Sequence, residues 1–334
     1  MVFPACYARG MTNPVIAEVF RGDTPESRHR GAFVVLDATG TTVASAGDHE
    51  AAFFPRSAIK AFQCVPLIES GAAKRFGLDD AEIALCCASH SGEAEHVRVA
   101  RSILAKAGIG EICLECGAHM PTAREATYDL VRHGEKPLQV HNNCSGKHAG
   151  MLALAKHLAA PLEGYVKLDH PVQQAIAATL SRYCNVNIAQ APMGIDGCSV
   201  PTWALPMNKL ALGFARLADA ENEAARLILR AARNHPLLIA GTDRFDTKVM
   251  QAVPRLFIKV GAEGVFCGTI AHAGLGFALK CDDGTSRGAE VAVAHMLAKL
   301  DVWNDNERQS LTSFAAQPLT NWRKISVGSV RATP

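Results

Sequence analysis

Ser57 and Lys60 form the only Ser-x-x-Lys sequence in this chain. On a helix, residues three apart lie on one face, so the Ser57 hydroxyl and the Lys60 amine can approach each other. A hydroxyl beside an amine that takes its proton is the minimal equipment of a serine nucleophile. Pro55 suits a helix start, and the backbone N–H groups there favour a developing negative charge. The motif is short enough to arise by chance, so it needs support from other segments.

Two further polar segments each precede a predicted helix. Residues 87–93 (CASHSGE) could present the Ser89 hydroxyl and backbone N–H groups to a substrate, or form an N-capping turn with Ser91 as the cap. Residues 141–148 (HNNCSGKH) are dense in polar groups, which packing alone explains poorly because buried polar groups need partners. This second segment either lines a site or caps its helix at Ser145.

Three weaker patterns complete the candidates. Glycines around Asp196 in 194–201 (GIDGCSVP) permit a tight backbone near a ligand, or a plain turn. Residues 259–261 (KVG) partly match the strand-borne Lys-Thr-Gly of Ser-x-x-Lys acyl enzymes, although an exposed edge-strand lysine is the simpler interpretation. Cys113 and Cys116 have zinc-like spacing, but a single Cys-x-x-Cys more often holds two structural thiols.

Strands are predicted near both ends of the chain and helices in the middle. Residues 32–47 indicate a hairpin, 255–265 a strand with a turn, and 266–280 paired strands, with a hairpin turn at Asp282-Asp283-Gly284. Periodic apolar residues predict helices over 94–107, 147–157, from His170 onward, over 210–230 with a break near 218, and over 288–300. This order favours an α+β fold, a mostly antiparallel sheet from about 14–54 and 255–300 with a helical region at about 55–250. We expect one domain over 1–334.

Composition excludes several classes of function. The 334 residues are 49% hydrophobic and 20% charged, typical of a globular protein with a buried core. A net charge of +2 with no Lys or Arg run, and only 6% aromatic residues, argue against nucleic-acid binding. No run of about 18 apolar residues occurs, so we expect no membrane association. Eleven cysteines without an export signal predict reduced thiols in the cytoplasm.

Taken together, these segments resemble the rhizobial-type (class 3) L-asparaginase family, distinct from the bacterial asparaginases that use threonine. The resemblance covers roughly Pro14 to Gly288. It rests on nine ordered blocks: RGDTPESRHRG (21–31), FPRSAIKAF (54–62), CASHSGEAEH (87–96), LECGAHMP (114–121), NNCSGKHAGML (142–152), DHPVQ (169–173), GIDGCSVPT (194–202), GTDRFDT (241–247) and KVGAEGV (259–265).

The resemblance implies a fold like serine β-lactamases and glutaminases and the hydrolysis of L-asparagine to L-aspartate and ammonia. It also implies a homodimer, a bound zinc ion and two Ser–Lys pairs. Its motifs assign particular residues to these roles: Ser57 with Lys60 and Ser89 with Lys259 as catalytic pairs, Cys144, Lys147 and Cys198 as zinc ligands, and Arg56, His90, Asn143 and Asp196 as substrate-binding residues.

On this interpretation Ser57 attacks the side-chain amide and forms an acyl-enzyme, which water hydrolyses. Lys60 serves as a base only when neutral, so its pKa must fall below the usual value of about 10.4. We expect zinc to orient the substrate. Two alternatives stay open: a glutaminase or broader serine amidase with the same chemistry and another pocket, and a zinc-stabilised binding protein in which Cys144 and Cys198 are structural.

Overall fold

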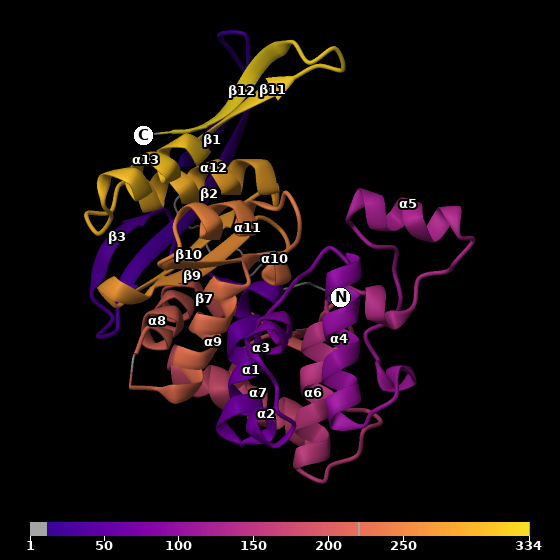
Figure 1. The fold of residues 1–334 in the computed structure, drawn as a ribbon. Coiled ribbons are helices and arrows are strands. Elements are labelled where there is room, and N and C mark those ends of the chain that lie inside the picture. The colour runs from indigo at the N-terminus through magenta and orange to yellow at the C-terminus, as the bar shows by residue number, and fades with distance from the viewer. Residues whose placement is uncertain (1–11, 220, 334) are drawn as a thin grey trace, which may run out of the picture.

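The computed structural model describes residues 12–219 and 221–333 (Figure 1). Within them an antiparallel sheet has the strand order β11-β12-β1-β2-β10-β9-β8, with β3 paired to β2. Its strands are β1 (Val15–Arg21), β2 (Thr24–Asp37), β3 (Thr42–Ala46), β8 (Leu256–Gly261), β9 (Val265–Ile270), β10 (Leu275–Cys281), β11 (Ala316–Thr320) and β12 (Ser326–Ala332). Strands from both ends of the chain therefore share one sheet.

Helices cover both faces of this sheet (Figure 1). Helices α12 (Ser286–Ala298) and α13 (Asp305–Phe314) lie on one face, and α8 (Met207–Leu217) lies on the other. Every residue of β9 is buried, as expected for a strand covered on both sides. A Cβ at Gly276 of β10 would lie 2.1 Å from the Ala215 nitrogen, so only glycine lets α8 approach this closely.

The middle of the chain is helical and forms the second half of the molecule (Figure 1). Helices α1, α3, α4, α6 and α7 pack together there, while α5 projects to one side. These and the neighbouring helices are α1 (Lys60–Glu69), α2 (Ala72–Arg75), α3 (Asp80–Cys86), α4 (Ala94–Ala107), α5 (Arg124–Arg132), α6 (Ser145–His157), α7 (Pro171–Cys184), α9 (Glu223–Asn234), α10 (Pro236–Ile239) and α11 (Phe245–Ala252).

Short strands and turns join the two halves. Strand β4 (Ala52–Phe53) pairs with β7 (Leu205–Pro206), and β5 (Met193–Ile195) pairs with β6 (Pro201–Trp203). The 3-10 turns are η1 (Arg56–Ile59), η2 (Glu111–Cys113), η3 (Gln139–His141), η4 (Ile188–Gln190) and η5 (Ala271–Ala273). One contiguous cluster of buried apolar side chains runs from the sheet into the helical half. No helix in the described part of the chain is long and apolar enough to cross a membrane.

The predicted α+β architecture is confirmed, and three details differ. Asp283 was expected in a hairpin turn, but its carboxylate accepts from the Thr285 N–H and the turn leads from β10 into α12. Ser91 was considered as the cap of α4, but Glu93 is the N-cap and the Ser91 hydroxyl donates to the Ala240 carbonyl. The sheet also extends beyond residue 300, because β11 and β12 pair along β1.

Candidate active site

Ser57 lies in a tight turn between strand β4 and helix α1. The preceding residue, Arg56, has a φ of +52°, a left-handed conformation that non-glycine residues rarely adopt. Such strain costs on the order of 1–3 kcal/mol and is concentrated at functional sites. Residues 56–59 form the 3-10 turn η1, which continues into α1 at Lys60. Ser57 therefore lies in the turn itself, and Lys60 is the first residue of the helix that follows.

Lys60 is fully buried behind this turn. Its Nζ donates to the Ala88 carbonyl at 2.7 Å and to the Cys144 Sγ at 3.1 Å. Among the described residues, no hydrogen bond joins the Ser57 hydroxyl to this amine. Catalytic hydrogen bonds are often loose without substrate, so this geometry does not remove Lys60 as a partner of Ser57. It does connect Lys60 directly to Cys144, one of the expected zinc ligands.

Ser89 belongs to the loop between α3 and α4, opposite the Ser57 turn. Its hydroxyl accepts from the Asn143 Nδ2 at 3.3 Å, and the His90 N–H donates to the Asn143 carbonyl at 3.1 Å. The His90 Nδ1 accepts from the Gly92 N–H, so its Nε2–H donates to the Ser145 hydroxyl at 3.0 Å. Burial holds the pKa of His90 well below its usual range. His90 is therefore a neutral residue that fixes the loop.

Lys259 lies on β8 and is fully buried, so the interpretation as an exposed edge-strand lysine is wrong. Its Nζ donates to the Val260 carbonyl at 2.9 Å and lies 3.8 Å from the Asp246 carboxylate. Burial lowers the pKa of Lys259 to about 7, although Asp246 opposes the shift. Strand β8 approaches the Ser57 turn closely, since a Cβ at Gly261 would lie 2.3 Å from the Pro55 carbonyl. The structure shows no Ser89–Lys259 hydrogen bond among the described residues.

The three expected zinc ligands come together from two segments. Cys144 immediately precedes α6, Lys147 lies in its first turn, and Cys198 lies in the loop between β5 and β6. The Lys147 Nζ lies 3.0 Å from the Cys198 Sγ. A hydrogen bond from the Cys198 thiol, together with the charges of nearby lysines, holds the pKa of Cys144 well below its usual range. The lowered pKa favours the thiolate form of Cys144, which is the form that binds a metal.

The donor set of this cluster suits zinc. Cysteine sulfur is a preferred zinc ligand, and a lysine amine would join the two sulfur atoms once it is deprotonated. The Lys147 Nζ and the Cys198 Sγ, 3.0 Å apart, are close enough for both to bind one ion. The Asp196 carboxylate lies 4.0 Å from the Cys198 Sγ. The residues present therefore fit the ion that the resemblance implies.

Other metal patterns receive no such support. Cys116 donates to the Gln139 carbonyl, and the Cys113–Cys116 pair joins no third ligand in the described residues. A separate group, His29 with Cys281 and Asp283, is internally satisfied: the His29 Nδ1 contacts Asp283 and its Nε2 accepts from Arg287. We interpret that group as structural.

A cavity of about 380 Å³ joins most of the predicted site residues. Its lining includes Arg56, Ser57, Ser89, His90, Asn143, Cys144, Asp196 and Cys198. Lys60, Lys147 and Lys259 lie outside this lining, buried close to it. Arg56 donates to the Asp196 carboxylate at 2.5 Å, which joins the Ser57 turn to the Cys198 loop.

The lining also includes residues that were not predicted from the sequence, and His119 and Arg244 are two of them. The His119 Nε2 accepts from the Asn143 N–H at 3.0 Å, and Arg244 lies at the start of α11. The blocks LECGAHMP and GTDRFDT had marked their segments, but nothing in those letters assigned them a role. Only the fold brings both segments to the cavity.

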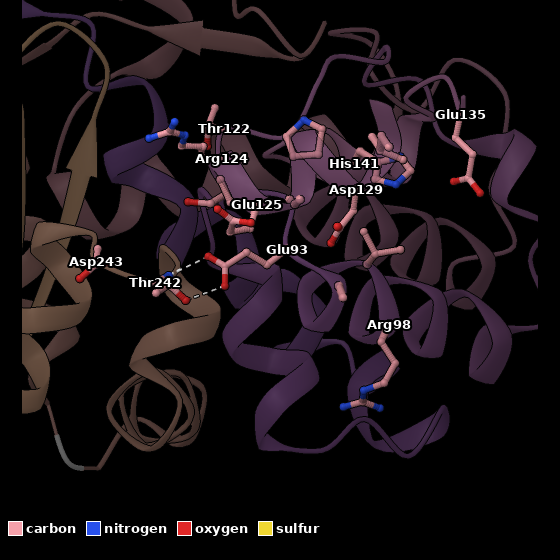
Figure 2. A pocket seen from close by; sticks show the side chains of 18 of the residues that line it. Glu93, Arg98, Thr122, Arg124, Glu125, Asp129, Glu135, His141, Thr242 and Asp243 are labelled. Carbon is pink, nitrogen blue, oxygen red and sulfur yellow. Dashed lines mark hydrogen bonds between the residues drawn. The ribbon is translucent and has the colours of Figure 1, made fainter. Parts of the chain in front are cut away.

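A second and larger cavity, of about 1030 Å³, opens between α4, α5 and the loop before α11. Figure 2 shows Glu93 and Thr242 next to each other in its lining, joined by two hydrogen bonds. Thr122 and Arg244 line both cavities, so the large cavity adjoins the one that contains Ser57.

One small cavity is thus surrounded by hydroxyls, buried amines and a thiol–amine cluster. These are the groups expected in the active site of a hydrolase. Residues 17–332 match the model of the L-asparaginase II family. The chain belongs to that family.

Comparisons with other proteins show only weak similarities. A comparison with curated protein sequences gives no match. The native form of Mglu, a glutaminase, is 14% identical with a TM-score of 0.37, and the match covers 83% of this chain and 66% of Mglu. A β-lactamase from Mycobacterium bovis is 12% identical with a TM-score of 0.27, covering 85% and 94%. Scores this low do not establish a shared fold, so the assignment rests on the family match.

Proposed function

We propose that the chain hydrolyses L-asparagine through a Ser57 acyl-enzyme, with Lys60 and Lys259 as proton carriers and a zinc ion that orients the substrate. The observation that supports this proposal best is the cavity of about 380 Å³. Ser57, Ser89, Asp196 and the two cysteines line it, and it is large enough for one amino acid.

The reaction then follows two steps. The Ser57 Oγ attacks the amide carbon while its proton passes to a neutral lysine, and the C–N bond breaks as ammonia leaves with a proton. Water next attacks the Ser57 ester, L-aspartate leaves, and the serine regains its proton. Splitting the hydrolysis this way replaces one difficult displacement with two easier ones.

Lys259 is the better candidate for the amine that is neutral at rest. A pKa of about 7 leaves a large fraction of this amine unprotonated near neutral pH, as general-base catalysis requires. The Lys60 Nζ lies between the Ser57 turn and Cys144, so it could pass a proton or stabilise charge there. Ser89, held by Asn143, could relay protons or bind the substrate amide.

Zinc would be held by Cys144, Lys147 and Cys198. When bound there, it would supply a Lewis acid with one open position for a substrate oxygen. Ser57 remains the nucleophile in this proposal. The Arg56–Asp196 pair, at 2.5 Å, would hold the Cys198 loop in register with the Ser57 turn. Asp196 would also be placed to accept from the substrate ammonium group.

We further expect a homodimer in the cytoplasm. The resemblance implies the dimer, and ten free cysteines in the described residues agree with reduced thiols. Light scattering on the purified protein would measure the dimer, and a monomer at working concentration would contradict it.

Ammonia release from L-asparagine and L-glutamine by the wild type and by Ser57→Ala tests the proposal. We expect activity on asparagine that falls at least about 10³-fold in the variant. Activity that survives Ser57→Ala would move the nucleophile to Ser89 or to a metal-bound water. Preference for glutamine would favour the glutaminase alternative.

A further inference from the structure

Arg244 lies where the two cavities meet. With Thr122 it lines both the cavity of about 380 Å³ that contains Ser57 and the outer cavity of about 1030 Å³. A small substrate that enters from the outer cavity passes this arginine on its way to Ser57. The end of the substrate that stays near Arg244 is then the end remote from the reacting amide.

In the described part of the chain, the Arg244 guanidinium forms no ion pair with a carboxylate. Arg56, the other arginine of the inner cavity, is bound to Asp196 at 2.5 Å. In contrast, no Asp or Glu of residues 12–219 and 221–333 lies within ion-pair distance of the Arg244 guanidinium. The positive charge of Arg244 also helps to lower the pKa of Lys259, which places the two groups in the same electrostatic environment.

The loop that carries Arg244 is held firmly. The Thr242 N–H and hydroxyl both donate to the Glu93 carboxylate at 2.7 Å (Figure 2). Gly241 has a φ of +133°, and a Cβ there would lie 2.5 Å from the Ser91 hydroxyl oxygen, so only glycine fits. Two residues after Arg244, the Asp246 carboxylate accepts from the Val260 N–H at 2.8 Å. The loop is therefore fixed to both α4 and β8.

L-asparagine offers a group that suits this position. Its α-carboxylate is the anionic end, and a guanidinium recognises a carboxylate through two parallel charge-assisted hydrogen bonds. We propose that Arg244 binds the α-carboxylate of the substrate and so selects α-amino acid amides over amides that lack this group. The inference rests on the proposed function, because it assumes that the amide end reaches Ser57.

A pair of substrates isolates this contact. β-Alaninamide has the carbon chain, amine and amide of asparagine but carries hydrogen in place of the α-carboxylate. We expect the wild type to prefer asparagine by about 100-fold in kcat/KM. In Arg244→Gln, kcat/KM for asparagine should fall about 100-fold while that for β-alaninamide changes less than about 3-fold. Arg244→Lys should recover part of the loss, since it keeps the charge.

Arg124→Gln is the matched control, because Arg124 lines only the outer cavity and hydrogen-bonds Tyr128. It should leave both rates unchanged. Equal losses on both substrates in Arg244→Gln, or no loss on either, would overturn the inference.

Binding of the product provides a readout that does not need turnover. L-aspartate and β-alanine differ by the same α-carboxylate, and calorimetry measures their affinities for Ser57→Ala and for Ser57→Ala with Arg244→Gln. We expect only L-aspartate to bind more weakly to the double variant. If L-aspartate binds both equally, the role of Arg244 is wrong. If instead wild-type activity survives Ser57→Ala while this discrimination holds, the proposed nucleophile fails and the carboxylate contact stands.

Discussion

The Nζ of Lys60 lies 3.1 Å from the Sγ of Cys144. One hydrogen bond therefore connects the amine expected to serve Ser57 with a thiol expected to bind zinc. Both side chains are buried, so this contact operates in a medium where charges interact strongly. The catalytic and metal-binding parts of the site are adjacent, and variants of either part separate their contributions.

Lys60→Met should abolish most activity and leave the metal in place. Lys60 is not among the expected ligands, and removal of a group that transfers a proton in the reaction typically costs about 10²–10⁴-fold in rate. Steady-state kinetics and zinc analysis of the same preparation measure the two effects. Lys74→Met, at an exposed site, is the control. Loss of zinc together with activity would show that Lys60 supports the metal and not the serine.

Cys198→Ser should lower the zinc content and raise KM more than it lowers kcat, because zinc is expected to orient the substrate. Cys113→Ser, at a half-buried thiol away from the cluster, should retain both zinc and activity. Circular dichroism checks that both variants fold. A zinc-free variant with an unchanged KM and no measurable kcat would contradict the division of labour between the metal and Ser57.

The activity should depend on the protonation of Lys259. If the neutral amine is required, kcat/KM rises as the pH increases through about 7, the pKa of the buried group, and then levels off. The unfolded chain keeps its lysine pKa near 10.4, so it binds more protons between pH 7 and about 10.4. The contribution of Lys259 to the free energy of unfolding should therefore increase as the pH rises from 7 to about 10.4.

Asp246→Asn tests whether Lys259 is the group whose titration causes this rise of kcat/KM with pH. The Asp246 charge opposes the lowering of the Lys259 pKa. Removal of this charge should therefore move the rise of kcat/KM to lower pH. An asparagine oxygen can still accept from the Val260 N–H, which preserves the hydrogen bond. A pH–rate profile that does not move would exclude Lys259 as the titrating group.

Gly261→Ala should disturb the Ser57 turn. The added Cβ would lie 2.3 Å from the Pro55 carbonyl, so the turn or β8 must shift. We expect at least a tenfold loss of kcat and a destabilisation of about 1–3 kcal/mol, the usual effect of overpacking. Gly110→Ala is the control, since its nearest neighbour would be 3.7 Å away. Full activity in Gly261→Ala would show that Ser57 tolerates movement of this strand.

The order of elements could be predicted because it depends on local patterns. Residues 94–107 form α4 at the predicted bounds, since apolar residues recur there at helical spacing. The strands after residue 300 were not predicted. Gln317 and Arg331 alternate with apolar neighbours only weakly, and pairing of β12 with β1 depends on contacts more than 300 residues apart in sequence.

The site residues that belong to sequence motifs could be predicted. The contacts that depend on the fold alone could not. Ser57, Asn143 and Cys198 were named from their blocks and line one cavity. The contact between Lys60 and Cys144 could not be foreseen, because 84 residues separate them. The role of Arg244 could not be predicted either, because it depends on the position of this residue where two cavities meet.

Covalent labelling by the diazoketone analogue of L-asparagine tests the central claim most directly. The diazo carbon of this analogue takes up a proton, and the serine Oγ then displaces dinitrogen from the same carbon to leave a stable ether. Peptide mass spectrometry locates that ether. We predict one adduct on Ser57, absent in Ser57→Ala and suppressed by L-aspartate. An adduct on Ser89, or labelling that persists undiminished in Ser57→Ala, would contradict the account.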